Sequence, residues 1–137
     1  MTEAALDVLH RDSRCAVINK PAGLMAHASG LARGEDDFLL HRLREQFASK
    51  VHLVHRLDRD TSGCLMLAKK RAVLLALQQD MQRNYIEKRY TALSKGRWPK
   101  GKNTINAPLR KNTLQSGERM VRVDASGKAS VTHFKIL

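Results

Sequence analysis

The strongest constraint on the fold is a pair of apolar segments separated by a short charged turn. Residues Val51–Leu57 and Gly63–Ala68 are rich in β-branched or aliphatic side chains, whereas Asp58–Ser62 is polar. Short apolar runs bounded by turn-forming residues predict β-strands. We therefore expect a sheet on both sides of this turn, with the Asp58 carboxylate at its rim, where a side chain is held by rigid backbone and still reaches a cleft.

Two helices and several further strands are expected around this turn. Apolar side chains recur at helical spacing in Glu35–Ala48 and in Lys70–Asn84, which predicts two amphipathic helices. Short apolar runs predict the other strands, which are Arg14–Asn19 before the Lys20-Pro21-Ala22-Gly23 turn, Lys88–Leu93, Thr104–Leu109, Arg119–Val123 and Ser130–Leu137. The predicted class is α+β, with a mixed, largely antiparallel sheet and flanking helices.

The positive charge of the chain is concentrated in its second part. The formal net charge is +12, yet residues 1–50 hold seven basic and seven acidic side chains, so residues 51–137 carry all of it. A basic region beside a neutral one favours a polyanionic partner such as nucleic acid. A solvated basic surface without a partner is the alternative. A membrane surface is less favoured, because the charge does not follow one amphipathic helix.

The composition argues against membrane-spanning, secreted and metal-binding classes. No apolar run is long enough to cross a bilayer, and the acidic N-terminus does not read as a secretory signal. Cys15 and Cys64 are the only cysteines, and neither has a neighbouring Cys or His at zinc-ligand spacing. We therefore expect a cytoplasmic protein with reduced cysteines and no bound metal.

The turn and its flanking residues resemble a known signature. Residues 55–63 read His-Arg-Leu-Asp-Arg-Asp-Thr-Ser-Gly, which is similar along its whole length to the signature loop of the RluA-type pseudouridine synthases. Segments similar to the other motifs of that family follow in the same order, namely Asn19–Gly23, Lys88–Leu93, Ala107–Leu109, Leu114–Gly117 and Gly127–Ser130. The resemblance runs from about residue 9 to the end, and is greatest to members that modify large-subunit ribosomal RNA.

The resemblance implies catalytic roles for Asp58 and Tyr90. Isomerising uridine requires that the N1–C1′ bond breaks and a C5–C1′ bond forms. A carboxylate serves this by attacking C1′ or by removing a proton from C2′, and the sequence leaves both routes open. Tyr90 is expected to stack on the uracil and help to move the C5 proton; a structural strand tyrosine is the alternative. Because no redox change occurs, no cofactor is expected.

Basic residues in and beyond the loop are the expected RNA contacts. The resemblance implies that Arg56, with Arg59 a weaker candidate, helps to extrude the base or holds a phosphate. Lys20 is placed with them, although support of the loop is its main expected role, and His55 is expected to be structural. The densest basic stretch supplies the candidate phosphate contacts, which are Arg97, Lys100, Lys102, Arg110, Lys111, Arg119 and Arg122. Trp98 in this stretch stacks on a base or anchors the core.

Two departures from the family pattern bear on domain organisation. No S4-type RNA-binding domain precedes Leu9, and no Gly-Arg-Thr-His-Gln-Ile-Arg-like strand, which should supply an arginine partner for Asp58, follows. The last predicted strand also ends on apolar residues. We therefore expect residues 1–137 to form one partial catalytic domain, truncated at its C-terminus and monomeric when complete.

Three functional hypotheses follow from these patterns. The first is an RNA pseudouridine synthase acting on large-subunit ribosomal RNA, with transfer RNA as the alternative substrate. The second is a non-catalytic RNA-binding module, which would need the basic residues but neither Asp58 nor Tyr90. The third is an inactive synthase fragment. A kinase-type His-Arg-Asp loop is rejected, because Leu57 disrupts its spacing and no Gly-rich phosphate loop precedes it.

Overall fold

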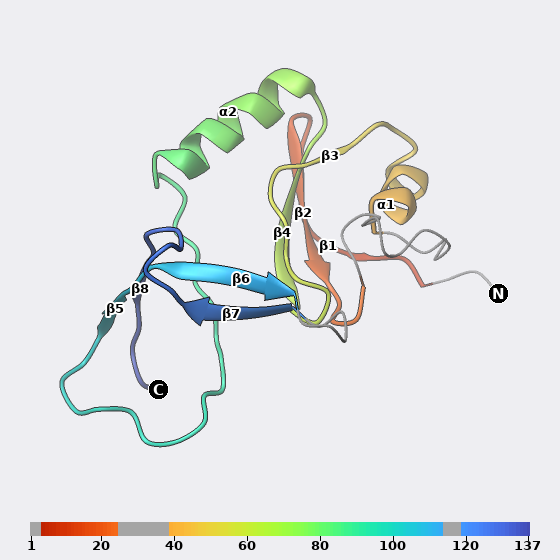
Figure 1. The fold of residues 1–137 in the computed structure, drawn as a ribbon. Coiled ribbons are helices and arrows are strands. Elements are labelled where there is room, and N and C mark those ends of the chain that lie inside the picture. The colour runs from red at the N-terminus through yellow and green to blue at the C-terminus, as the bar shows by residue number, and fades with distance from the viewer. Residues whose placement is uncertain (1–3, 25–38, 114–118) are drawn as a thin grey trace. The chain divides into compact units, whose positions relative to one another are not determined.

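The computed structural model describes residues 4–24, 39–113 and 119–137 (Figure 1). Contacts within the chain divide it into two compact units, Met1–Arg89 and Tyr90–Leu137. The expectation of a single partial catalytic domain stays a prediction. In the described ranges, no helix has the length and apolar character needed to cross a bilayer.

A four-stranded antiparallel sheet forms the first unit. Its order is β1-β2-β4-β3, with bounds Asp7–Arg11, Cys15–Lys20, Gly63–Ala68 and His52–Leu53 (Figure 1). The central strands β2 and β4 pair along their whole length, from Cys15 opposite Ala68 to Lys20 opposite Gly63. Alternate residues of both strands point into the core, where Ile18, Leu65 and Leu67 are fully buried.

Two helices accompany this sheet, and they contribute differently to the core. Helix α1 (Leu39–Phe47) buries Leu39, Leu43 and Phe47, which recur every four residues and so lie on one face. These side chains join those of β2 and β4 in one hydrophobic cluster. Helix α2 (Arg71–Gln82) follows β4 directly and has no buried residue.

The second unit consists of two small antiparallel ribbons. Strand β5 (Thr104–Asn106) pairs with β8 (Val131–His133), and β6 (Leu109–Thr113) pairs with β7 (Arg119–Val123). A further backbone bridge joins Leu109 to Lys128. Trp98 and Phe134 form an edge-to-face pair with ring centroids 4.1 Å apart. Among the described residues of this unit, none is fully buried.

The predicted α+β class is confirmed, and every strand pair described is antiparallel. The strands Gly63–Ala68 and Arg119–Val123 (β7) have the predicted bounds, and β2 and α2 lie within one or two residues of theirs. Helix α1 confirms the second half of Glu35–Ala48, whose residues 35–38 lie outside the described ranges. Strand β1 was not predicted, because its alternation of apolar and polar side chains is short and broken by a bulge after Val8.

Four strand predictions were wrong in whole or in part. The predicted strand Val51–Leu57 shortens to His52–Leu53, because the backbone ladder to β4 is interrupted after Val54. Lys88–Leu93 forms no strand, and the boundary between the two units falls inside it. Thr104–Leu109 splits into β5 and β6 around Pro108, which lacks an N–H for a ladder. Ser130–Leu137 forms a strand only over Val131–His133.

Candidate active site at the Asp58 loop

The candidate site is the segment that leaves β3 and returns in β4. Its start is held by two bonds to β4: the Val54 N–H donates to the Met66 carbonyl at 3.0 Å, and the Met66 N–H donates to His55 Nε2 at 3.1 Å. Its end is Gly63, whose φ of 126° is a conformation that favours glycine. Both ends therefore rest on the best-paired strand of the first unit.

Between these ends, the loop is fixed on either side of Asp58. On one side, Leu57 is buried in the hydrophobic cluster. On the other, the Arg59 carbonyl accepts two hydrogen bonds of 2.8 Å, one from Lys20 Nζ and one from the Gly23 N–H. The Thr61 N–H donates to the Asp58 carbonyl at 3.1 Å and closes the turn. The backbone at Asp58 is thus pre-organised before any substrate binds.

Lys20 is the buried polar side chain that supports this loop. It is 0% exposed, and its ammonium donates to the carbonyls of Pro21 and Arg59, each at 2.8 Å. Burial lowers the pKa of Lys20, while the carboxylates of Asp60 and Asp58 oppose this shift. The structure therefore gives Lys20 contacts that support the loop, as its sequence position suggested, and an RNA contact would require it to become exposed.

Asp58 itself is exposed, so its carboxylate is open to a ligand. The guanidinium of the neighbouring Arg59 bonds the Asp60 carboxylate at 3.0 and 3.2 Å. Arg56 is also exposed and remains a candidate for phosphate or base contact. The local arrangement is a fixed backbone that presents the Asp58 side chain to solvent.

The other predicted site residues belong to the second unit. Tyr90 is 63% exposed and lies outside the helices and strands. The side chains of five predicted phosphate contacts are also exposed: Arg97, Lys100, Lys102, Lys111 and Arg122. Arg110 is exposed as well and lies 3.7 Å from the Asp124 carboxylate. The side chain of Arg119 lies outside the described residues, and Trp98 is half-buried against Phe134.

The β6–β7 ribbon gathers several of these cations. Arg110 lies directly opposite Arg122, and like charges in that position oppose pairing, although the Asp124 carboxylate near Arg110 offsets part of the repulsion. An open pocket of about 790 Å³ lies beside the ribbon. Its wall is largely apolar, with Leu109 and Val121, and it also includes the polar residues Arg110, Lys111, Lys128, Ser126 and Ser130. Cations and hydroxyl groups together are typical ligands for phosphate oxygens.

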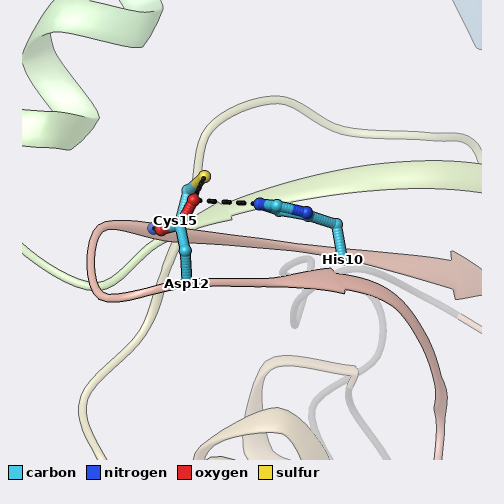
Figure 2. Close-up of side chains that lie close together, drawn as sticks. All are labelled: His10, Asp12 and Cys15. Atoms are coloured by element: carbon cyan, nitrogen blue, oxygen red, sulfur yellow. Dashed lines mark hydrogen bonds and ion pairs between the residues drawn. The ribbon is translucent and has the colours of Figure 1, made fainter.

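A second cluster of polar side chains lies on the β1–β2 hairpin. His10, Asp12 and Cys15 point toward one another (Figure 2). The atoms that could bind a metal, one from each side chain, all lie within 4.8 Å of one another. This proximity was not predicted from the sequence, because His10 and Cys15 are brought together by the hairpin and not by a metal-binding spacing. The sequence feature that could have indicated this cluster is Asp12, a turn-forming residue between two short strands.

Asp12 accounts for the geometry of this cluster. Its Oδ1 accepts the N–H groups of Arg14 at 2.7 Å and Cys15 at 2.8 Å, and its Oδ2 is 2.9 Å from His10 Nε2. The Cys15 N–H, the His10 side chain and the Arg14 N–H hold the pKa of Asp12 well below its ordinary range. The Asp12 carboxylate therefore stabilises the hairpin turn. Its four hydrogen bonds are sufficient to account for the proximity of the three side chains.

Comparison with known proteins places this fold and loop in a family. The family described as RNA pseudouridylate synthase matches residues 14–137. The chain therefore belongs to the RNA pseudouridylate synthase family.

Individual relatives align with nearly the whole of this chain. The chain is 46% identical over 137 residues to the ribosomal large subunit pseudouridine synthase C of Haemophilus ducreyi, which covers 99% of this chain and 42% of that protein. It is 47% identical over 130 residues to the protein of the same name from Salmonella typhi, covering 94% of this chain and 40% of the relative. The chain thus spans about two fifths of the length of these relatives.

Solved structures agree on the fold. Human RNA pseudouridylate synthase domain containing 1 superposes with a TM-score of 0.72 at 22% identity, over 96% of this chain and 53% of that one. Human RNA pseudouridylate synthase domain containing 4 gives a TM-score of 0.62 at 20% identity, over 93% of this chain and 52% of that one.

Proposed function

We propose that this chain carries the catalytic aspartate of an RNA pseudouridine synthase, and that Asp58 is that residue. Family membership supports the reaction class. The observation that carries the assignment is the double hydrogen bond to the Arg59 carbonyl, beside an exposed Asp58. A side chain that is open to a ligand while its backbone is fixed on both sides is what a pre-organised reacting group requires.

The reaction needs one carboxylate and an extracted uridine. In one route Asp58 attacks C1′ and displaces the N1 of uracil; after the base turns, C5 bonds to C1′ and displaces the carboxylate. In the other, Asp58 removes the C2′ proton as the N1–C1′ bond breaks and returns it when C5 bonds to C1′. The C5 proton moves to solvent or to a protein group, and we assign Tyr90 to that step and to stacking on the base. The base must leave its stack, which is the role proposed for Arg56. No redox cofactor enters this scheme.

Ribosomal RNA of the large subunit is the proposed substrate. Its support is the activity for which the two bacterial relatives, 46% and 47% identical to this chain, are named. Arg97, Lys100, Lys102, Arg110 and Lys111 are the proposed phosphate contacts, since all five are exposed in the second unit. Transfer RNA is the alternative substrate. We place the protein in the cytoplasm, as a monomer.

A non-catalytic RNA-binding role is the second candidate. It is favoured by the exposed cations of the second unit and by the pocket beside the β6–β7 ribbon, which require no contribution from Asp58. The two candidates differ in one measurable respect, namely whether removal of the Asp58 charge stops turnover or changes nothing.

The test is Asp58→Asn, a change that keeps the shape of the side chain and removes its nucleophilicity and basicity. We expect pseudouridine formation in large-subunit RNA to fall by roughly 10⁴-fold or more, the order seen when an essential reacting group is removed. RNA affinity should stay within a few-fold of the parent. Asp80→Asn, which removes a carboxylate from α2, is the control and should retain activity. Near-parental turnover by Asp58→Asn would contradict the assignment.

A further inference from the structure

The peptide ladder between β3 and β4 is completed by a side chain. We propose that His55 is a positioning residue for Asp58: its neutral imidazole replaces a backbone carbonyl as the acceptor for Met66 and so turns the chain out of the sheet into the loop. The structural part of this inference concerns His55 alone, whereas its catalytic part rests on the function proposed for Asp58.

The register of the two strands shows the replacement. His52 lies opposite Ala68 and Leu53 opposite Leu67, so Val54 is the next residue and lies opposite Met66. In a regular antiparallel ladder, such a pair exchanges both of its N–H···O bonds. One of them is present, from the Val54 N–H to the Met66 carbonyl at 3.0 Å. For the other, the Met66 N–H donates to His55 Nε2 at 3.1 Å.

The replacement of a backbone carbonyl by the His55 ring as acceptor ends β3 and determines where the loop begins. A third peptide pairing at Val54 would extend the strand toward Asp58 and draw the following residues along β4. Because the imidazole takes that place, pairing stops and the chain is free to bury Leu57 and to present Asp58 outward. Met66 is on the same strand that anchors the end of the loop at Gly63. His55 thus joins the start of the loop to the strand in which the loop ends.

The hydrogen bond requires a defined state of the ring. A ring nitrogen accepts only when it carries no proton, so Nε2 must be bare and the neutral ring must carry its proton on Nδ1. In the protonated ring, the Nε2–H would point at the Met66 N–H, and no hydrogen bond could form between two donors. With Nε2 occupied in this way, the ring is unsuited to shuttle protons for the reaction, which leaves positioning as its role.

The surroundings of the ring favour the neutral state. Burial lowers the pKa of His55 from its ordinary 6.5, and the positive charge of Lys88 acts in the same direction, whereas a backbone hydrogen bond with Arg56 favours the protonated ring. The other charged or titratable groups on the same segments are His52, Arg56 and Asp58 before the turn and Cys64 on β4. The net lowering of the His55 pKa keeps Nε2 unprotonated at neutral pH, so that it can accept the hydrogen bond from Met66.

The sign of the pH dependence follows from this direction. A lowered pKa in the folded state means that the unfolded chain, or an opened loop, binds the proton more readily. The stabilisation by His55 is therefore complete above its ordinary pKa of 6.5 and is lost as pH falls through the lowered value. Acid should release the Met66 N–H and loosen the Asp58 loop.

The first test reads the ring directly in the unaltered full chain, by NMR of the imidazole nitrogens and of the Met66 amide. We expect a neutral ring with the proton on Nδ1 at neutral pH, and an exchange-protected Met66 N–H that loses protection as the ring titrates. A ring protonated at neutral pH, or one with its proton on Nε2, would overturn the proposal. This measurement does not depend on activity, so it stands even if Asp58 proves not to be catalytic.

The second test compares two variants at His55. His55→Gln offers a carbonyl oxygen near the Nε2 position that does not titrate, and His55→Leu offers no acceptor. If Asp58→Asn has shown Asp58 to be catalytic, we expect His55→Leu to lower kcat by about a hundredfold with little change in KM, the loss typical of a misplaced reacting group. His55→Gln should retain most of kcat at neutral pH and lose the acid-side decline. His52→Gln, on β3, is the matched control and should keep the parental pH profile.

Two results of the variant series would contradict the proposal. One is a parental kcat for His55→Leu, which would show that the acceptor is dispensable. The other is an unchanged acid limb in His55→Gln, which would show that a different group titrates. If the unaltered protein forms no pseudouridine, the proposed function fails, and protection of the Met66 amide in the same variants then decides on His55 alone.

Discussion

The two compact units of this chain are stabilised by different means. The first unit surrounds a hydrophobic cluster in which Ile18, Leu39, Leu43, Leu65 and Leu67 are fully buried. In the described residues of the second unit, strands pair in two ribbons, yet Val121, Val123 and Val131 remain more than half exposed. Side-chain burial therefore stabilises the first unit, whereas the second is shaped by backbone pairing together with the Trp98–Phe134 ring pair.

The charge follows the same division. Residues 90–137 carry a net charge of +8, whereas the longer stretch of residues 1–89 carries +4. Like charges such as Arg110 and Arg122 face each other across the β6–β7 ribbon. A segment that buries little and carries many cations gains from an anionic partner, because the Asp124 carboxylate near Arg110 offsets only part of its positive charge. The first unit is therefore suited to hold a reacting group and the second to meet a polyanion.

The largest expected effect is a difference between the two units in how much the loss of one aliphatic side chain lowers the free energy of unfolding. Leu65→Ala should destabilise the first unit by about 2–5 kcal/mol, since it leaves a cavity in a fully packed core. Val121→Ala, at a position 53% exposed, should change the stability of the second unit by less than about 1 kcal/mol. Denaturant unfolding is followed by helical circular dichroism for the first unit, which contains both helices, and by Trp98 fluorescence for the second.

The two probes also test whether the contrast between the units is valid. We expect Leu65→Ala to move the helical transition more than the Trp98 transition. Equal shifts of both would show that the units unfold as one cooperative body, and the contrast between them would then be wrong.

An intermediate effect is expected at a close backbone contact of the second unit. A Cβ at Gly127 would lie 2.5 Å from the Leu109 carbonyl carbon and 2.6 Å from its oxygen. Gly127→Ala should therefore separate Leu109 from Lys128, which exchange two backbone hydrogen bonds, and cost about 1–3 kcal/mol within that unit. Hydrogen exchange at these two amides is the measurement. Ala125→Ser, at an exposed position of the same turn, is the control, and unchanged protection in Gly127→Ala would refute the prediction.

The smallest effect concerns the charge contrast and the salt dependence of RNA binding. Replacing Arg97, Lys100 and Lys102 together by Gln should flatten the logarithmic salt dependence of affinity by about 0.7–0.9 units for each phosphate that is no longer bound. The control replaces Lys70, Arg71 and Arg83 by Gln, which removes the same charge from the two ends of α2. Equal flattening by both triple variants would mean that total charge matters and that the second unit holds no special path for RNA.

Local pattern predicted much of the first unit and less of the second. The strand Gly63–Ala68 and helix α2 were found because their periodicity is long and uninterrupted. Thr104–Leu109 was misjudged although Pro108 stands inside it, and Lys88–Leu93 was misjudged because β-propensity does not reveal whether a partner strand exists.

The sequence by itself determined the class of fold, the basic character of the second unit and, through the resemblance of residues 55–63, the identity of Asp58 as the candidate reacting group. Only the tertiary structure decided how that residue is held. Lys20 and Arg59 are 39 positions apart, and His55 and Met66 are 11 apart, yet each pair shares a hydrogen bond. Contacts of that kind follow from the register of β2, β3 and β4, and register is a property of paired strands that no single segment carries.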